Sequence, residues 1–148
     1  MKKISYEEFS ERLKHGKKNF NDLIFEDMNL RGFNLSRLDF SSSNFINVDF
    51  SNVDFTDSNL ENCLLDDCNM ENVIFVNSNL KKASMRRVNL QYANIKGAKL
   101  YAVVLEGANL KNIIFDNKTE YFKLYCPEKG AFIAYKKGLN NRIIKLLI

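Results

Sequence analysis

Residues 88–112 read VNLQY ANIKG AKLYA VVLEG ANLKN, and the third residue of every group of five is large and apolar. The same spacing extends in both directions, so that every fifth residue from position 25 to position 115 is large and apolar. We call these nineteen residues the centres: Phe25, Leu30, Leu35, Phe40, Phe45, Phe50, Phe55, Leu60, Leu65, Met70, Phe75, Leu80, Met85, Leu90, Ile95, Leu100, Leu105, Leu110 and Phe115. A fixed period sustained over this length indicates a repeat architecture.

A period of five fits neither regular secondary structure. On an α-helix each centre would be rotated by about 140° from the last one, and on a plain strand the centres would alternate between two faces. A chain that turns a corner every five residues keeps all the centres pointing to one axis. Asn or Asp directly precedes twelve of the nineteen centres, and both residues favour turns because their side chains bond to nearby backbone. The repeat therefore predicts a solenoid with the centres inside.

The pentapeptides at 93–97 (ANIKG) and 108–112 (ANLKN) match the signature A(D/N)LXX almost literally, and residues 21–117 resemble the pentapeptide-repeat proteins. The resemblance implies an all-β fold, a right-handed quadrilateral β-helix with four pentapeptides in each of about five coils. Centres twenty residues apart then share a face. The first face stacks Phe25, Phe45, Leu65, Met85 and Leu105; the second Leu30, Phe50, Met70, Leu90 and Leu110; the third Leu35, Phe55, Phe75, Ile95 and Phe115; the fourth Phe40, Leu60, Leu80 and Leu100.

The repeat is flanked by two segments of different pattern. Residues 1–20 predict an N-terminal cap with a short helix from about 5 to 15, because SYEE at 5–8 is a capping box and Gly16 is a stop signal. Residues 118–148 predict a small β module of three strands, FKLYCP, GAFIAYKK and RIIKLLI. It resembles a module that follows pentapeptide repeats in some bacterial and phage proteins. We expect it to cover the apolar cross-section of the last coil.

Candidate catalytic and metal-binding residues are few. Cys63 and Cys68 occupy interior positions of the repeat, Cys126 lies in the tail, and the single histidine, His15, falls at the end of the predicted helix. An odd cysteine count at these spacings fits neither a disulfide framework nor a zinc site. We therefore expect free thiols, no metal, no cofactor, no small-molecule substrate and no enzymatic activity. With neither an apolar run that could span a membrane nor a secretory signal, we expect a cytoplasmic protein.

Charge and exposed apolar positions indicate candidate partner surfaces. The formal charge is −9 over residues 21–75, +5 over 76–117 and +5 over 118–148, with a net charge of +4 for the chain. Aliphatic residues replace Asn or Asp before several centres, and others directly follow a centre. The candidate partner residues are the apolar Leu64, Val104, Ile74, Ile46 and Val76 and the basic Lys81, Lys82, Arg86 and Arg87.

These observations favour a non-catalytic scaffold that binds an unidentified protein. Two alternatives stay open. Some pentapeptide-repeat proteins resemble duplex DNA in shape and charge and protect topoisomerases such as gyrase, but their shafts are longer and acidic. Direct nucleic-acid binding by the basic half is the other alternative, although only Tyr92 and Tyr101 supply aromatic rings among its basic residues. Both a monomer and a homodimer formed through the tail fit the sequence.

Overall fold

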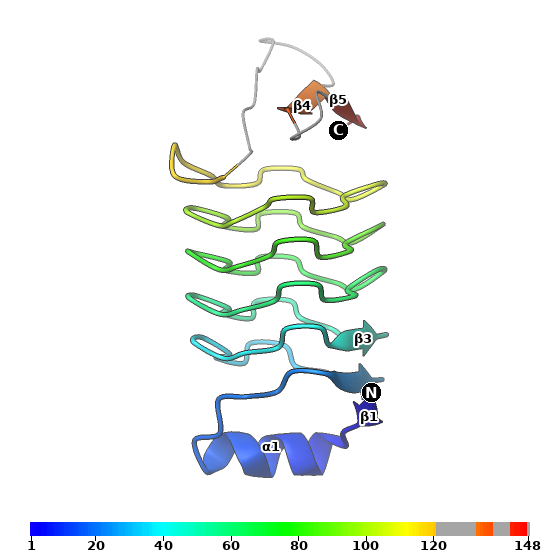
Figure 1. Ribbon diagram of the computed structural model, residues 1–148, viewed down its shortest axis with the longest axis vertical. Helices are drawn as coiled ribbons and strands as arrows, with labels where there is room; N and C mark the ends of the chain where they lie inside the picture. The colour runs from blue at the N-terminus through cyan, green and yellow to red at the C-terminus, as the bar shows by residue number, and fades with distance from the viewer. Residues whose placement is uncertain (121–132, 138–142, 148) are drawn as a thin grey trace.

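The computed structural model describes residues 1–120, 133–137 and 143–147. Its backbone forms a stack of similar coils, with a helix lying across the end that carries the N-terminus (Figure 1). The regular elements are β1 (Lys2–Lys3), α1 (Tyr6–Lys14), β2 (Leu23–Glu26), β3 (Asn44–Ile46), β4 (Ile133–Lys137) and β5 (Ile143–Leu147). Strands β1, β2 and β3 form one parallel sheet in that order, while β4 and β5 pair antiparallel.

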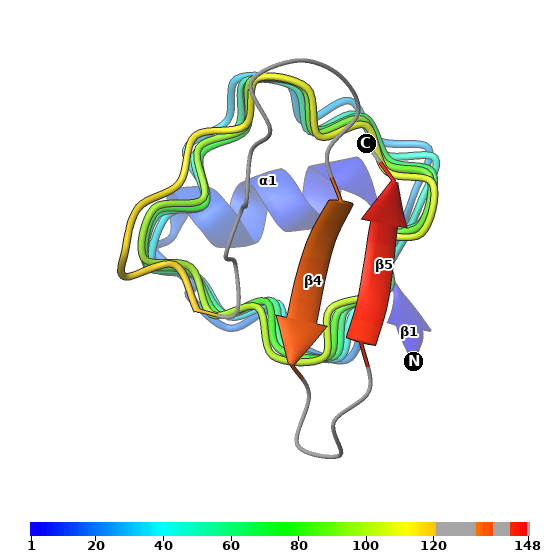
Figure 2. The ribbon, with the colours of Figure 1, turned by 90° about the horizontal axis from the view of Figure 1, so that it is seen from above.

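The coils are joined by parallel backbone pairing between residues twenty positions apart. One column of this pairing links Asn29, Asp49, Asn69, Asn89 and Asn109, the residues directly before the centres of the second face. Equivalent columns run along the other three faces, so four pentapeptides make one coil, and the coils superimpose when seen along the stack (Figure 2). We number the coils 1 to 5 by their first-face centres, from Phe25 to Leu105.

A tight turn closes each corner between two faces. The second residue after each centre from position 20 to position 110 has a positive φ, between 52° and 73°. Asn and Asp tolerate this left-handed conformation, yet Arg37, Lys82 and Ala102 adopt it as well. The turn is reinforced from the residue before the centre: the Asp49 Oδ1, for example, accepts the backbone N–H of Ser51 at 2.9 Å. Corner geometry is therefore set by the repeat rather than by one residue type.

The centres fill the interior of the shaft. All of them are buried except Leu105, which is partly buried, and Phe115, which is 36% exposed. The expectation of a buried centre is thus wrong for Phe115. Both residues belong to coil 5, beyond which no further pentapeptide coil stacks to cover them. The expected cover, residues 118–148, lies largely outside the described residues.

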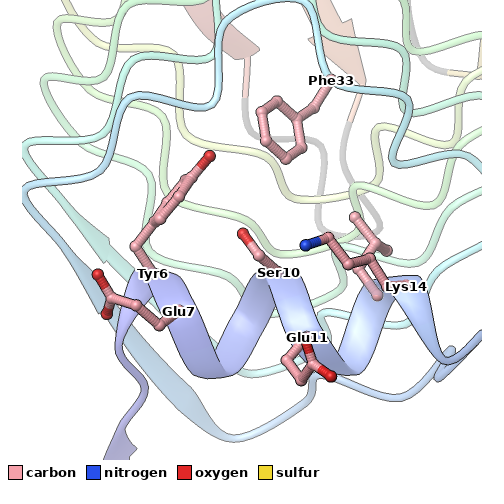
Figure 3. A pocket seen from close by; sticks show the side chains of 7 residues that line it. Tyr6, Glu7, Ser10, Glu11, Lys14 and Phe33 are labelled. Atoms are coloured by element: carbon pink, nitrogen blue, oxygen red, sulfur yellow. The ribbon is translucent and has the colours of Figure 1, made fainter.

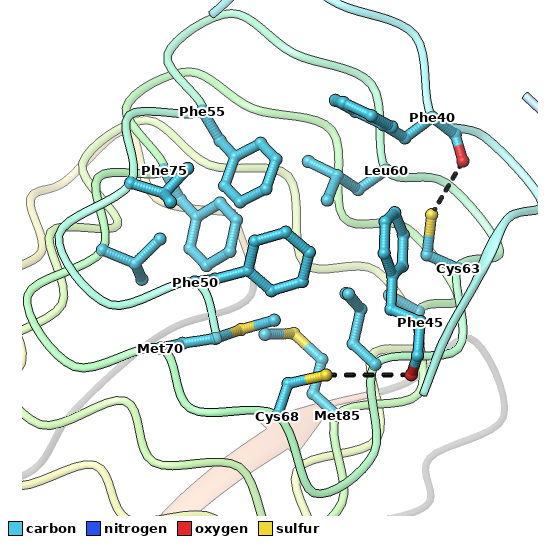
Figure 4. Packing of buried hydrophobic residues seen from close by; sticks show 14 of the residues in the cluster. Phe40, Phe45, Phe50, Phe55, Leu60, Cys63, Cys68, Met70, Phe75 and Met85 are labelled. Atoms are coloured by element: carbon cyan, nitrogen blue, oxygen red, sulfur yellow. Dashed lines mark hydrogen bonds between the residues drawn. The ribbon is translucent and has the colours of Figure 1, made fainter. Parts of the chain in front are cut away.

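Aromatic rings pack along and across the coils (Figure 4). Phe55 and Phe75, neighbours on the third face, stack with centroids 5.3 Å apart and an interplanar angle of 11°. Phe50 meets the rings of Phe45 and Phe55 edge-on at 5.1 and 5.2 Å. Offset-stacked and edge-on contacts are the favourable arrangements for such rings. The interior is accordingly a packed core, and the gap near its C-terminal end is only about 10 Å³.

The repeat begins earlier, and the N-terminal cap therefore ends earlier, than the sequence analysis placed them. Phe20 is fully buried and Asn19 pairs with Asp39, so the repeat extends one pentapeptide into the segment assigned to the cap. Helix α1 starts after Ser5, whose Oγ accepts the backbone N–H of Glu8. Its Phe9 ring lies 4.9 Å from the Phe20 ring, which closes this end of the core.

The C-terminal segment is described only in part. Two of the three expected strands correspond to β4 and β5, whose register places Tyr135 beside Lys145. The first expected strand, FKLYCP, lies outside the described residues, as does Cys126.

Replacement of an interior ring is expected to weaken the whole shaft. Phe50→Ala should lower the free energy of unfolding by about 3–5 kcal/mol, because it removes buried contacts and leaves a cavity. Ile74→Ala, at a 36% exposed side chain, should cost less than about 1 kcal/mol. Urea unfolding followed by circular dichroism measures both. Equal losses for the two variants would contradict an interior position for Phe50.

The two described cysteines should resist modification in the folded protein. Cys63 and Cys68 are buried free thiols that donate to the carbonyl oxygens of Phe40 and Phe45, at 3.0 and 3.8 Å. Burial raises the pKa of Cys63 to about 12 and that of Cys68 to about 11, so almost no reactive thiolate is present at neutral pH. In a Cys126→Ser variant, a disulfide reagent should react with both only after denaturant is added. Rapid reaction in native buffer would contradict this.

Candidate interaction faces

The four faces of the shaft are of two kinds, distinguished by the residue directly before each centre. On the second face this position carries a ladder of side-chain hydrogen bonds. The Nδ2 of Asn69 donates to the Oδ1 of Asp49 at 3.2 Å, Asn89 donates to Asn69 at 3.4 Å, and Asn109 donates to Asn89 at 2.9 Å. On the fourth face Asn79 donates to Asn59, and Asn59 to Asp39, both at 3.0 Å.

The ladders have a direction. Each amide donates toward the N-terminal coil, so the last acceptor in both ladders is an aspartate, which has no hydrogen to donate. The Oδ1 of Asn69 also accepts the backbone N–H of Glu71, which ties the ladder to the corner turn. These Asn and Asp side chains are thus used in holding adjacent coils together.

The first and third faces carry aliphatic side chains at some of the same positions, among polar ones: Ile24, Leu64 and Val104 on the first face, and Ile74 and Ile114 on the third. Leu64 on the first face is 47% exposed, and Ile74 and Ile114 on the third are 36% and 46% exposed. A branched hydrocarbon cannot continue an amide ladder, so the side-chain hydrogen bonding stops at these residues. Since a coil visits the four faces in order, the two faces lie on opposite sides of the shaft (Figure 2).

The structure divides the predicted apolar partner residues between these two faces. Ile46, which is 42% exposed, lies close to Leu64 on the first face, on the neighbouring coil. Val104 belongs to the same face and is half-buried, whereas Val76 is half-buried and accompanies Ile74 on the third face. The predicted set is therefore two separate surfaces.

The predicted basic residues differ in their pairing. Arg87 binds Asp67 with two parallel bonds of 2.7 Å, and Arg86 reaches Asp66 at 3.5 Å. Asp66 is partly buried, which raises its pKa, but hydrogen bonds from Ser84 and Arg86 outweigh this and lower the pKa. The hydrogen bond from Arg87 likewise lowers the pKa of Asp67. These pairs cross from acidic coil 3 to basic coil 4 and neutralise part of the charge asymmetry.

The lysines at the corner between the fourth and first faces are different. Lys81 is half-buried and Lys82 is exposed. Neither side chain forms an ion pair within the described part of the chain.

The shallow hollows on the described surface include two that border exposed apolar side chains. One, of about 560 Å³, is on the first face and is bordered by Ile46, Leu64 and Arg86. The other, of about 580 Å³, lies between α1 and coil 1, where Tyr6 meets Phe33 edge-on at 6.4 Å (Figure 3). The sequence analysis missed this second hollow. The unusually bulky Phe33, in a position that later coils fill with valine, alanine or isoleucine, was the available signal.

Nothing in the described ranges resembles a metal centre, since no three His, Cys, Asp or Glu side chains gather as ligands there. His15 ends α1, with its Nδ1 2.8 Å from the carbonyl oxygen of Glu11. Among the described helices none is long and apolar enough to cross a membrane.

Comparison with known proteins agrees with this architecture. The family model of the pentapeptide repeat region matches residues 38–115, more than half of the chain. The chain therefore belongs to the pentapeptide-repeat family, and membership implies a right-handed β-helix.

The solved structures that match the chain include three with broad coverage. The pentapeptide-repeat protein Rfr23 from the cyanobacterium Cyanothece 51142 is 22% identical, with 74% of this chain and 94% of that chain covered and a TM-score of 0.48. The pentapeptide-repeat protein alr5209 from Nostoc PCC 7120 is 17% identical, with 78% of this chain and 83% of that chain covered and a TM-score of 0.41. QnrB1, a plasmid-mediated fluoroquinolone resistance protein, is 17% identical, with 81% of this chain and 72% of that chain covered and a TM-score of 0.32. No curated protein matches the chain.

Charge introduced into an amide ladder should destabilise the shaft. Asn69→Asp keeps the side-chain shape but removes the donor to Asp49 and places two carboxylates side by side. We expect a loss of about 1–3 kcal/mol at pH 7. Mutual repulsion raises a carboxyl pKa in the folded state, so the deficit should be largest at neutral pH and shrink as the pH falls toward about 4, where one carboxyl is protonated.

The matched control is Asn52→Asp, at an exposed corner position with positive φ. It changes the charge equally without interrupting a ladder, and it should alter stability by less than about 0.5 kcal/mol. Chemical unfolding of both variants between pH 4 and pH 8 measures the difference. A pH-independent deficit in Asn69→Asp would rule out carboxylate repulsion as its cause.

Proposed function

We propose that this protein is a non-catalytic scaffold that binds protein partners through its first and third faces. The observation that carries the proposal is the placement of exposed aliphatic side chains, Leu64 and Ile74 above all, where the second and fourth faces carry an amide ladder.

The energetic argument is that these residues contribute little to the isolated shaft. An asparagine at position 64 would gain side-chain hydrogen bonds to the adjacent coils, whereas the exposed Leu64 side chain leaves much of its apolar surface in water. Burial of that surface against a partner would gain the hydrophobic free energy that the isolated shaft forgoes while Leu64 stays in water. Exposed apolar residues framed by charged ones are typical of protein-binding surfaces.

The proposal also covers the handedness of the shaft, its number of sides and coils, and its two end segments. We take the shaft to be a right-handed quadrilateral β-helix of about five coils, capped by α1 and followed by a separate β module from residue 118. The twenty-residue pairing and the paired strands β4 and β5 support this description. We also place the protein in the cytoplasm, because the buried thiols of Cys63 and Cys68 are free and a reducing compartment keeps thiols in that form.

A second candidate is direct nucleic-acid binding by the basic coils. It is favoured by Lys81 and Lys82, whose ammonium groups form no ion pair in the described residues. Mimicry of duplex DNA has less support, because Asp66 and Asp67 are already paired with arginines. A salt-dependent shift of labelled DNA tests the first of these, and a gyrase supercoiling assay tests the second.

The scaffold proposal is tested by protein capture with face-specific variants. The full chain, Leu64→Asn and Ile74→Asn are immobilised separately and incubated with native cell extract, with Glu71→Gln on the second face as the control. We expect a specific protein to be retained by the full chain and the control and to be lost with one of the asparagine variants. An identical set of bound proteins for all four would contradict the proposal.

A further inference from the structure

We propose that the fourth face is a self-complementary docking surface, on which a second copy of this chain binds antiparallel through ion pairs. The two copies are related by a two-fold axis that lies in the plane of contact and runs across both shafts. The proposed scaffold function uses the first and third faces, so this inference goes beyond it. The contact does not use residues 118–148, unlike the dimer expected from the sequence.

Two columns of outward side chains run along the fourth face, one on each side of the centres. Adjacent members of a column are separated by one coil, about 4.8 Å, and the coils superimpose along the shaft (Figure 2). In each column the carboxylate lies on an earlier coil than the lysine. From coil 1 to coil 4, the column before the centres reads Asp39, Asn59, Asn79 and Lys99, and the column after them reads Ser41, Glu61, Lys81 and Tyr101.

Asp39 and Lys99 are charges without an opposite charge nearby in their column. On the adjacent coils this column carries only uncharged side chains. Three coils, about 14 Å, separate the two residues, which is too far for an ion pair within one chain. Lys99 is exposed and forms no ion pair in the described part of the chain. Asp39 accepts hydrogen bonds from Ser41 and Asn59 through Oδ1, so its Oδ2 can accept a further donor.

Glu61 and Lys81 are neighbours in the other column, yet they are not joined to each other. The Glu61 carboxylate accepts from the Nδ2 of Asn79 at 3.1 Å through Oε2, and its second oxygen can accept a further donor. The half-buried Lys81 side chain forms no ion pair within the described ranges. By contrast, Asp67 and Arg87 satisfy each other with two bonds of 2.7 Å. The fourth face therefore keeps its lysines for an external partner.

The two-fold axis keeps each column opposite itself and reverses the order of the coils. When the axis passes between coils 2 and 3, Lys99 lies opposite the partner's Asp39, and Lys81 lies opposite the partner's Glu61. Each contact occurs twice, because a two-fold interface is symmetric. The register therefore joins four pairs of opposite charge, including the two charges that have no counterpart in their own column.

The remaining rows of this register are uncharged. Asn59 lies opposite the partner's Asn79, and Ser41 lies opposite the partner's Tyr101. No like charges are therefore opposed along either column from coil 1 to coil 4. The long lysine side chains face shorter carboxylate ones, which suits the separation of about 10 Å between packed sheets.

Other arrangements of the same face give poorer matches. An axis through coil 2 would place Glu61 opposite its own copy, and an axis through coil 3 would do the same to Lys81, so like charges would repel. An axis along the shaft would exchange the two columns and set Lys99 opposite the partner's Tyr101, without forming any ion pair. The charges thus select one antiparallel register.

The expected dimer is weak and sensitive to salt. A single face of this shaft is smaller than the roughly 800 Å² per partner of a standard interface. Exposed ion pairs each contribute little, and dissolved salt screens them. We therefore expect the dimer to dissociate on dilution and at high ionic strength.

Analytical ultracentrifugation of the full chain, from about 10 μM to about 1 mM, covers the range expected for such a small interface. We expect a monomer–dimer equilibrium whose dissociation constant rises by at least about tenfold between about 0.05 M and about 0.5 M NaCl. A chain that stays monomeric at the highest concentration in low salt overturns the proposal. A dimer whose dissociation constant does not respond to salt also overturns it.

Charge reversal tests the register. Glu61→Lys sets two lysines opposite each other, and Lys81→Glu sets two carboxylates opposite each other, so each variant alone should dissociate at least about tenfold more readily. An equimolar mixture of the two variants should dimerise again, because the introduced lysine of one copy then meets the introduced glutamate of the other. Circular dichroism checks that both variants stay folded.

The matched control is Glu71→Lys, which makes the same change at a half-buried position on the opposite, second face. It should alter the dissociation constant by less than about twofold. A dimer that survives Glu61→Lys, or is lost with Glu71→Lys, contradicts the proposal. Failure of the mixed variants to associate contradicts the antiparallel register.

The dimer and the scaffold function can fail separately. The scaffold variants Leu64→Asn and Ile74→Asn lie outside the fourth face and should dimerise as the unchanged chain does. A monomer that still captures a partner protein would overturn the dimer and leave the scaffold function standing, and a dimer without any captured protein would do the reverse. A monomer that shifts labelled DNA would assign Lys81 and Lys99 to nucleic acid and overturn the dimer.

Discussion

The backbone pairing between residues twenty positions apart is the constraint on which the rest of this structure depends. Each pentapeptide of coils 2 and 3 carries one bridge to the coil below and one to the coil above, so these coils have no freedom to shift by a single residue without losing their neighbours. The same pairing forces every centre to the axis. Large residues such as Phe50 and Phe55 fill that axis, and the gap near the C-terminal end of the described core is only about 10 Å³.

This constraint leaves few positions where the sequence can vary without affecting the fold. The centre is fixed by packing, and the second residue after it must adopt a positive φ, although residues as different as Arg37 and Ala102 do so. Two kinds of side chain occur directly before the centre. An amide extends a ladder between coils, whereas an aliphatic side chain faces solvent. Leu64 and Ile74 show the second outcome on two opposite faces. In the proposed scaffold, the departures from the repeat carry the functional information.

Much of the fold could be predicted from the sequence because its signal is local and periodic. Burial follows from position in the repeat for nearly all centres, and it fails at Phe115, where coil 5 lacks a further repeat coil. The burial of Phe20 could have been predicted from the same period, because Phe20 lies five residues before Phe25. The hollow between Tyr6 and Phe33 could not be predicted from the period. It depends on how α1 crosses coil 1, and no periodicity encodes that placement.

Charge counted along the chain gave an incomplete view of the surface. Segment totals describe an acidic start and a basic end, yet the twenty-residue period brings Asp67 beside Arg87 and Asp66 beside Arg86. In a solenoid the relevant neighbours of a charge are one period away, so complementarity must be evaluated along columns.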